Sequence, residues 1–203
     1  SDVCSSDLMK IDEQTAVIDN DFTNHLAEAR LDDDQLVELL RTIFSDLGLS
    51  TAMHPLVYQY ELRQDLPRIR LLFDRGIVVK AEFSDIHQND DGKKAYYAYL
   101  VENLYRAISG DALPASLSGE ALFTRWLSGS SLGEVHSVAT CLTCGCGIFL
   151  SDDNDSKRLQ RFIAEKAIGT INVYNRKELI DKHLAQGGPQ IPRKVRQSLT
   201  HRP

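Results

Sequence analysis

Clustered acidic side chains follow two short apolar segments of the sequence. The acids are Asp19 and Asp21 after residues 15–18, and Asp152, Asp153 and Asp155 after residues 148–150. Like charges at contact distance raise one another's pKa, so carboxylates gathered in a cleft favour bound protons or a bound cation. Hard oxygen ligands select Mg²⁺ or Mn²⁺, and such ions can activate water against a phosphate ester. This pattern indicates metal-assisted phosphoryl chemistry.

The elements that must position these acids alternate between strands and helices. Short apolar runs predict strands over residues 15–18, 76–81, 148–150 and 170–174. Helical spacing of apolar residues predicts helices over residues 36–47, 55–62, 96–108, 121–127, 131–142, 155–167 and 177–184, although residues 53–61 also allow a strand. This alternation predicts an α/β three-layer sandwich with a mostly parallel central sheet. Ligands of such folds bind beyond the carboxyl ends of the strands, where the acids stand.

Composition is that of an ordinary globular protein of one domain. The chain has 203 residues, of which 42% are hydrophobic and 26% charged, which excludes collagen-like, low-complexity and wholly disordered classes. A formal net charge of −6 is the opposite of what passive binding to phosphate backbones needs. A nucleic-acid substrate would therefore require metal ions.

Expectations about the ends of the chain and its compartment also follow from patterning. No apolar run approaches the roughly 18 residues of a membrane span, and no secretory leader is evident, so we expect a cytoplasmic protein without membrane contact. Residues 1–8 match no element pattern and are interpreted as a non-native leader. We expect one domain over residues 9–184, with a helical insertion at about 85–130. A basic tail over residues 185–203 is interpreted either as a contact for RNA or as a frayed end.

Four segments together resemble the PIN-domain ribonucleases, a family that includes the VapC-type toxins of toxin–antitoxin pairs. The segments are Ala-Val-Ile-Asp-Asn-Asp at 16–21, Val-Tyr-Gln-Tyr-Glu-Leu at 57–62, Leu-Gly-Glu-Val-His-Ser-Val-Ala at 132–139 and Ile-Phe-Leu-Ser-Asp-Asp-Asn-Asp at 148–155. Their order and spacing are similar to the family's pattern over residues 15–180. Two features depart from it: many members have Asp where Glu134 stands, and residues 85–128 are longer than in compact toxins.

The resemblance implies a metal-dependent endoribonuclease that leaves a 5′-phosphate and a 3′-hydroxyl. It implies Asp19, Glu61, Glu134 and Asp153 as catalytic ligands of Mg²⁺ or Mn²⁺. Asp21, Asp152 and Asp155 are lesser candidates. If the protein is a toxin, an antitoxin should occupy a groove near the acids, and a homodimer is the other assembly that we consider.

Each acidic motif also has a purely structural interpretation. Ser131 and Glu134 fit a capping box, and residues 151–155 fit a helix cap with acids in the first turn. Glu61 could pair with Arg63 or Arg68. Asp19 has less structural reason to be acidic, because Thr23 can cap the next helix. The alternative functions are accordingly a non-catalytic PIN-like module that binds RNA or protein, and another Mg²⁺-dependent phosphotransfer enzyme or DNA-directed nuclease.

Cysteine and histidine chemistry is not favoured by the pattern. A zinc site on Cys141, Cys144 and Cys146 would need a fourth ligand, for which His136 is the one nearby candidate. The cysteines also stand at the end of a predicted helix, where the dipole does not lower a thiol pKa, so we interpret them as reduced, buried small residues. The histidines form no cluster visible in the sequence. We expect His136 at the surface or beside the metal ligands.

Overall fold

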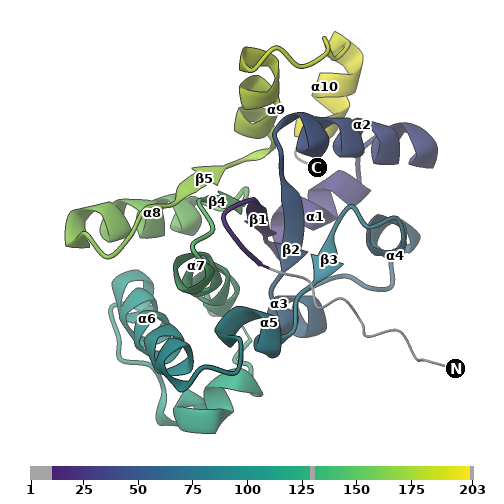
Figure 1. Ribbon diagram of the computed structural model, residues 1–203. Helices are drawn as coiled ribbons and strands as arrows, with labels where there is room; N and C mark the ends of the chain where they lie inside the picture. The colour runs from purple at the N-terminus through teal and green to yellow at the C-terminus, as the bar shows by residue number, and fades with distance from the viewer. Residues whose placement is uncertain (1–10, 129–130, 202–203) are drawn as a thin grey trace, which may run out of the picture.

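A five-stranded, all-parallel sheet forms the centre of the computed structural model, which describes residues 11–128 and 131–201 (Figure 1). Its strands are β1 Thr15–Ile18, β2 Ser50–Met53, β3 Val79–Lys80, β4 Ile148–Leu150 and β5 Asn172–Tyr174. They lie in the order β3-β2-β1-β4-β5, and Ile18 pairs with Leu150 across β1 and β4. The predicted α/β sandwich with a parallel sheet is confirmed.

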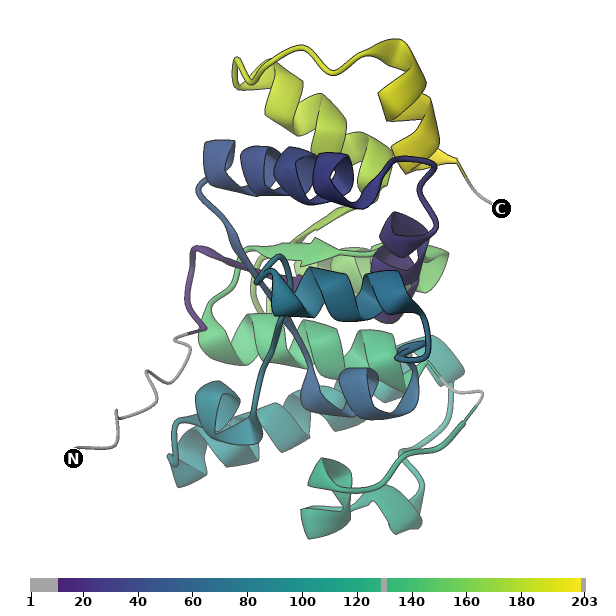
Figure 2. The ribbon, with the colours of Figure 1, turned by 90° about the vertical axis from the view of Figure 1, so that its right-hand side faces the viewer.

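Helices cover both faces of the sheet and enclose two cores. One core contains α1 Asn20–Ala27, α2 Asp33–Asp46, α4 Pro67–Asp74, α9 Arg176–Ala185 and α10 Arg193–Thr200. The other contains α5 Phe83–His87, α6 Asp91–Ser109, α7 Leu132–Cys144 and α8 Asn154–Lys166, with the 3₁₀ helices η1 Ala115–Leu117 and η2 Gly119–Phe123. Figure 2 shows α2, α9 and α10 at one end of the molecule and α6 at the other.

Alternation along the strands explains this layering. Ala16 and Ile18 of β1 face the core with α2 and α9, whereas Val17 between them faces the core with α6 and α7. Phe149 and Leu150 of β4 divide between the two cores in the same way. A parallel strand buried on both faces needs apolar residues at successive positions, which is why these runs are continuous.

The strand order creates a switch point between β1 and β4. The chain begins in the middle of the sheet, proceeds outward through β2 and β3, and then returns to β4 and β5 on the other side. The connections that leave β1 and β4 therefore diverge to opposite sides, and a crevice opens at the carboxyl ends of these strands. Asp19 and the turn that starts at Ser151 follow those two ends.

Several predicted boundaries differ from the structure. Strand β2 was not predicted, because Ser50 and Thr51 interrupt its apolar pattern. The predicted strand at 76–81 reduces to Val79–Lys80, an exposed edge. The preferred helix after Pro55 is confirmed as α3 Pro55–Tyr60, with the proline in its first turn. A helix at 121–127 is not formed, since η2 ends at Phe123.

Helices α4 and α5 also went unpredicted, and the tail is more ordered than a frayed end. Residues 193–200 form α10, whose Leu199 is buried in the core beside α2, as is Ile191 just before the helix. Residues 83–123 carry the helices α5, α6, η1 and η2, in the segment interpreted as an insertion. The interpreted leader at 1–8 lies outside the described residues, as does Arg202 of the tail. Among the helices that the structure describes, none has the length and apolar character needed to cross a membrane.

Candidate metal centre

An acidic pocket of about 290 Å³ lies at the switch point between β1 and β4. It is lined by Asp19, Asn20, Asp21, Glu61, Ser131, Glu134 and Asp153. These residues come from four segments: the turn after β1, the end of α3, the start of α7 and the turn after β4. All four principal residues of the sequence prediction line this pocket, and Asp21 lines it too.

Asp19 and Asp153 occupy equivalent positions, each between a strand and the next helix. One carboxylate oxygen of Asp19 accepts the Phe22 N–H at 2.8 Å, and one of Asp153 accepts the Asp155 N–H at 2.7 Å. Each side chain therefore caps a helix. The expectation that Thr23 caps α1 is wrong, because its hydroxyl donates to the Asp19 carbonyl within the helix. A carboxylate has a second oxygen, so capping and pocket roles are compatible.

Glu61 follows the last residue of α3 and packs against the start of α7. Gly133 permits this approach, because a Cβ atom there would stand 2.4 Å from Oε2 of Glu61. The two arginines that could have paired with Glu61 have other partners. Nη1 of Arg63 lies 3.4 Å from Oε1 of Glu28, and Nε of Arg68 lies 2.8 Å from Oδ1 of Asp33. The interpretation of Glu61 as a solvated, arginine-paired acid therefore does not describe the structure.

Ser131 and Glu134 do not form the capping box that their spacing allows. The Ser131 side chain makes no capping bond to α7, and its hydroxyl instead donates to Oδ2 of Asp155 at 3.1 Å. The other oxygen of Asp155 accepts from Arg158 at 2.8 Å. Asp155 does not line the acidic pocket, so its role here is to orient Ser131.

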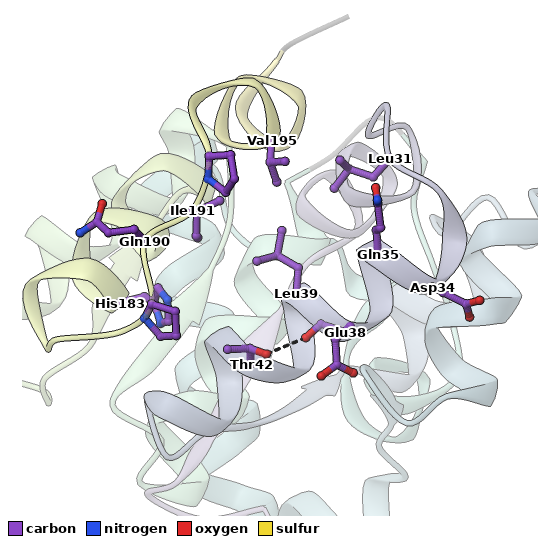
Figure 3. A pocket seen from close by; sticks show the side chains of 12 residues that line it. Leu31, Asp34, Gln35, Glu38, Leu39, Thr42, His183, Gln190, Ile191 and Val195 are labelled. Carbon is purple, nitrogen blue, oxygen red and sulfur yellow. Dashed lines mark hydrogen bonds between the residues drawn. The ribbon is translucent and has the colours of Figure 1, made fainter.

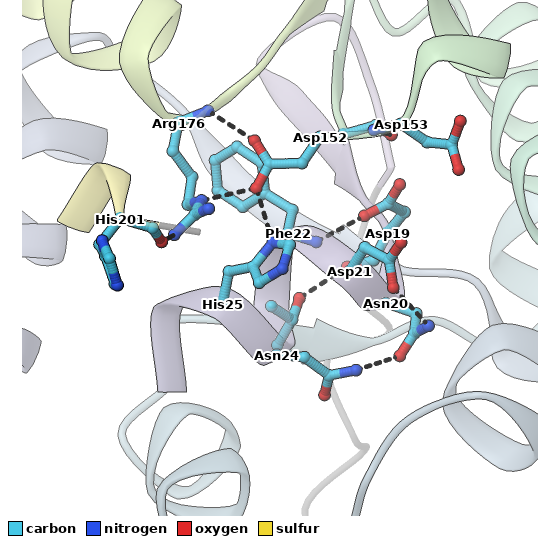
Figure 4. Close-up of polar contacts among 12 residues, drawn as sticks. Asp19, Asn20, Asp21, Phe22, Asn24, His25, Asp152, Asp153, Arg176 and His201 are labelled. Atoms are coloured by element: carbon cyan, nitrogen blue, oxygen red, sulfur yellow. Dashed lines mark hydrogen bonds and ion pairs between the residues drawn. The ribbon is translucent and has the colours of Figure 1, made fainter. Parts of the chain in front are cut away.

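Asp152 points away from the acidic pocket, and Figure 4 shows its side chain turned toward Arg176 while Asp153 points the other way. Oδ2 of Asp152 accepts from Nε of Arg176 at 2.5 Å and lies 2.8 Å from Nδ1 of His25. The Arg176 guanidinium also donates to the carbonyls of Leu199 and His201, at 2.7 and 3.1 Å. Asp152 thus joins the turn after β4 to α10 and is not placed as a metal ligand.

Burial, together with neighbouring negative charge, raises the pKa of Asp19, Glu61 and Glu134. Burial, followed by the charges of Glu134 and Asp21, raises the pKa of Glu61 to about 8. Burial raises the pKa of Glu134 to about 7, with contributions from Asp153 and Asp21. The pKa of Asp19 also lies well above its ordinary value, chiefly because the side chain is buried, although hydrogen bonds from Ser151 and Phe22 oppose the shift. These three carboxyls therefore keep their protons to a higher pH than ordinary acids do, because burial and neighbouring negative charge disfavour the ionised form.

The donor set fits a hard divalent cation. Among the residues that the structure describes, the lining offers five carboxylates, the Asn20 amide and the Ser131 hydroxyl, and it includes no Lys, Arg or His. Oxygen ligands without a resident counter-charge suit Mg²⁺ or Mn²⁺. Within residues 11–128 and 131–201, no three His, Cys, Asp or Glu side chains already stand in a metal-binding arrangement. A divalent cation would have to draw these side chains together to complete its coordination.

A buried histidine pair behind the pocket escaped the sequence prediction. The Leu56 N–H donates to Nδ1 of His54 at 3.2 Å, which leaves Nε2 of His54 to donate to the Tyr97 hydroxyl at 2.8 Å. Tyr97 in turn donates to Nδ1 of His136 at 2.6 Å. His136 is 1% exposed, so its expected place at the surface is wrong, whereas the alternative place beside the metal ligands stays a prediction. These bonds connect α3, α6 and α7, and thereby the segments that carry Glu61 and Glu134.

The three cysteines described by the structure are free thiols. Cys141 and Cys146 are buried and Cys144 is half-buried, and burial raises the pKa of the Cys144 thiol to about 11. Thiols with raised pKa are poor nucleophiles and poor metal ligands. Their expected role as small buried residues fits this setting.

A larger cavity, of about 610 Å³, lies between α2 and residues 189–195 (Figure 3). Its walls include Leu31, Leu39, Ile191 and Val195, and none of the residues predicted for the site lines it. The smaller acidic pocket, rather than this apolar cavity, has the groups needed for hydrolytic chemistry.

Comparison of the chain with protein-family models, with curated proteins and with solved structures gives no match. The acidic pocket must therefore be interpreted from its own geometry and charge.

Proposed function

We propose that this protein is a metal-dependent endoribonuclease whose acidic pocket binds Mg²⁺ or Mn²⁺. The observation that carries the proposal is the convergence of Asp19, Glu61, Glu134 and Asp153 from four chain segments at the switch point of the sheet. If Asp19 and Asp153 served only as helix caps, nothing would require Glu61 and Glu134 to line the same pocket. The choice of RNA as substrate, and of the products, comes from the resemblance to PIN-domain ribonucleases.

The four acids hold the cation, and their protonation tunes the site. A bound divalent ion supplies a Lewis acid that makes water nucleophilic and offsets phosphate charge. Glu61 and Glu134, with pKa values near 8 and 7, release protons as the cation binds. Asp21 is exposed at the mouth of the pocket, where its carboxylate can accept a proton from the attacking water. The Ser131 hydroxyl donates its proton to Asp155, which leaves its oxygen lone pairs to accept a hydrogen bond or to bind a cation at the pocket wall.

The partners stay predictions. Support for an antitoxin or for a homodimer comes only from the resemblance, and the cytoplasmic location comes only from sequence composition. A non-catalytic module that binds RNA or protein is the function that remains if the cation does not bind.

Calorimetric titration with Mn²⁺ tests the metal centre. We expect the wild type to bind Mn²⁺ and the double variant Asp19→Asn, Asp153→Asn to lose that binding. Asparagine caps helices as well as aspartate does, so the double variant should keep both caps and lose only charge. Asp32→Asn is the matched control: Asp32 caps α2 by accepting the Gln35 N–H at 2.8 Å, outside the acidic pocket.

Cleavage of RNA tests the activity in the same proteins. Changing groups that merely orient ligands costs 10- to 100-fold, so loss of two ligands should lower Mn²⁺-dependent cleavage more than about 100-fold. Asp32→Asn should cleave like the wild type. A folded wild type that fails to bind Mn²⁺ would overturn the proposal, as would cleavage that survives in the double variant.

A further inference from the structure

An exposed aromatic side chain immediately precedes Glu61, one of the residues that line the acidic pocket. Tyr60, the last residue of α3, precedes Glu61 and is 45% exposed. Exposed tyrosines are commonly mobile, but this one is fixed at two points. Its ring stacks on that of Trp126 with centroids 5.7 Å apart and planes 12° apart. Its hydroxyl donates to the Thr124 carbonyl at 3.3 Å.

Trp126 is itself braced by the buried core. Its ring also stacks on His136, at 6.1 Å and 24°, and His136 stacks on His54 at 4.9 Å and 17°. The hydrogen bonds of Tyr97 hold both histidines in place. A column of rings therefore extends from the interior to the solvent and ends at Tyr60. Since His136 lies two residues beyond Glu134, the column is connected to both glutamates of the pocket.

A rigid aromatic face beside a phosphate site suits a nucleobase. Bases stack on aromatic side chains whatever their sequence, because every base has a π-face. A platform already held in one orientation loses little conformational entropy when a base stacks on it. Bases within a duplex are stacked on one another, so only an unpaired base can reach such a face. Arg125, exposed beside Trp126, adds positive charge near this path.

We propose that the outer face of Tyr60, held by Trp126, is a subsite for an unpaired nucleobase next to the phosphate that the acidic pocket receives. This inference rests on the proposed nuclease function for the position of that phosphate. It assigns to Tyr60 and Trp126 the recognition of single-stranded substrate, a role separate from metal binding.

Binding of labelled oligonucleotides to the Asp19→Asn protein tests the subsite without turnover. Anisotropy is measured with a single-stranded RNA 12-mer, with the same strand in a duplex, and with a 12-mer that lacks bases. Removal of a base-stacking ring weakens binding by about 1 to 3 kcal/mol, so Tyr60→Ala should weaken single-strand binding about 5- to 150-fold. Tyr60→Phe should stay within about 2-fold, and the variants should not differ on the duplex or the abasic strand.

Two further variants control for structure. Tyr60→Leu keeps apolar packing on Trp126 but removes the aromatic face, so it should weaken binding as Tyr60→Ala does even if the alanine variant is unstable. Tyr99→Ala removes a tyrosine that is 55% exposed on α6 and should leave binding unchanged. Stacking on Tyr60 should also quench Trp126, the single tryptophan of the chain.

The outcomes separate this inference from the proposed function. If the wild type binds Mn²⁺ and cleaves RNA while Tyr60→Ala and Tyr60→Leu bind the single strand as Tyr99→Ala does, the subsite is wrong and the nuclease stands. Equal losses on single strand, duplex and abasic strand would likewise overturn the subsite. If Tyr60→Ala selectively weakens single-strand binding in a protein that neither binds Mn²⁺ nor cleaves, the subsite stands and the nuclease is wrong.

Discussion

At the scale of single residues, two types of interaction meet in the acidic pocket. Asp19 and Asp153 each use one oxygen to cap a helix, which fixes their position, and both line the pocket. Glu61 and Glu134 make no comparable cap, and their pKa values rise to about 8 and 7 in the buried, acidic surroundings. Carboxyl groups whose pKa values are shifted by burial and neighbouring charge are typical of functional sites rather than of structural caps.

Gly133 gives the most local test of this arrangement. Gly133→Ala would place a Cβ atom 2.4 Å from Oε2 of Glu61, and because that oxygen ends a flexible side chain, the carboxylate should move. We expect Mn²⁺ affinity, measured by calorimetry, to fall about 10-fold or more. The free energy of unfolding should fall little, since alanine is the better helix former by up to about 1 kcal/mol.

Gly147→Ala is the control for that substitution, because nothing lies within 4 Å of a Cβ atom at Gly147. Unchanged Mn²⁺ affinity in Gly133→Ala would mean that Glu61 is not a ligand.

At the scale of elements, two polar networks hold the segments that carry the acids. The buried Arg176 joins Asp152, beside the pocket residue Asp153, to the carbonyls at the end of α10. The pair of His54 and His136 with Tyr97 joins α3 and α7 across α6. Each network connects elements that are distant in sequence. Each therefore fixes how those elements lie relative to one another, rather than the local conformation of one element.

Arg176→Met should strongly destabilise the fold. It leaves the 6%-exposed Asp152 side chain without its arginine and the Leu199 carbonyl without its donor. Removal of one partner of a buried ion pair costs about 3 to 5 kcal/mol, which urea denaturation can measure. Hydrogen exchange in α10 should rise first. Lys177→Met is the control, because Lys177 forms an exposed ion pair with Asp181 and its loss should cost less than about 1 kcal/mol. Equal losses of stability in the two variants would contradict the proposed role of Arg176 in joining Asp152 to α10.

Tyr97→Phe tests the histidine network with the loss of one oxygen atom. The N–H of His54 and Nδ1 of His136 would then be buried without this partner, which costs about 1 to 3 kcal/mol of unfolding free energy. Tyr99→Phe, at an exposed position on the same helix, should stay within about 0.5 kcal/mol. A similar stability of the two variants would argue against these hydrogen bonds.

At the scale of the whole molecule, stability and metal binding are coupled through protons. Glu61 and Glu134 keep protons in the folded state at pH values where the unfolded chain, with ordinary glutamate pKa values, has released them. Their contribution is therefore greatest near the unfolded pKa and is lost as the pH rises through about 7 and 8. Without divalent ions, the free energy of unfolding should fall between pH 6.5 and 8.5.

The window from pH 6.5 to 8.5 lies above the range in which the buried histidines affect stability. Burial lowers the pKa of His136 to about 3 and that of His54 well below its usual value. These two histidines therefore affect the free energy of unfolding only below the ordinary histidine pKa, where they destabilise the fold as the pH falls. Urea denaturation in EDTA at several pH values measures the slope. Glu61→Gln should flatten it, and Mn²⁺ should reverse it because the ion binds the deprotonated acids. A wild-type stability that rises over this window would contradict the pKa shifts.

Much about this protein was determined by local sequence. Continuous apolar runs at residues 15–18 and 148–150 predict buried strands, and the acids after them predict a crevice, because parallel strands end at one edge of a sheet. Pro55 identifies the start of α3, and Gly145 ends α7 in the left-handed region. These features depend on neighbours in the chain, so a pattern of types and spacing can predict them.

Other features were decided only by tertiary structure. Whether Asp152 or Asp153 faces the pocket depends on Arg176 and α10, which are distant in sequence. The pairing of His54 with His136 likewise needs the packing of α3 against α7, and the stacking of Tyr60 on Trp126 needs α3 to meet the segment between η2 and α7. Strand β2, with the polar Ser50 and Thr51, forms because β1 and β3 provide its partners on either side. Side-chain direction and partners are long-range properties, and the spacing of residues along one chain does not encode them locally.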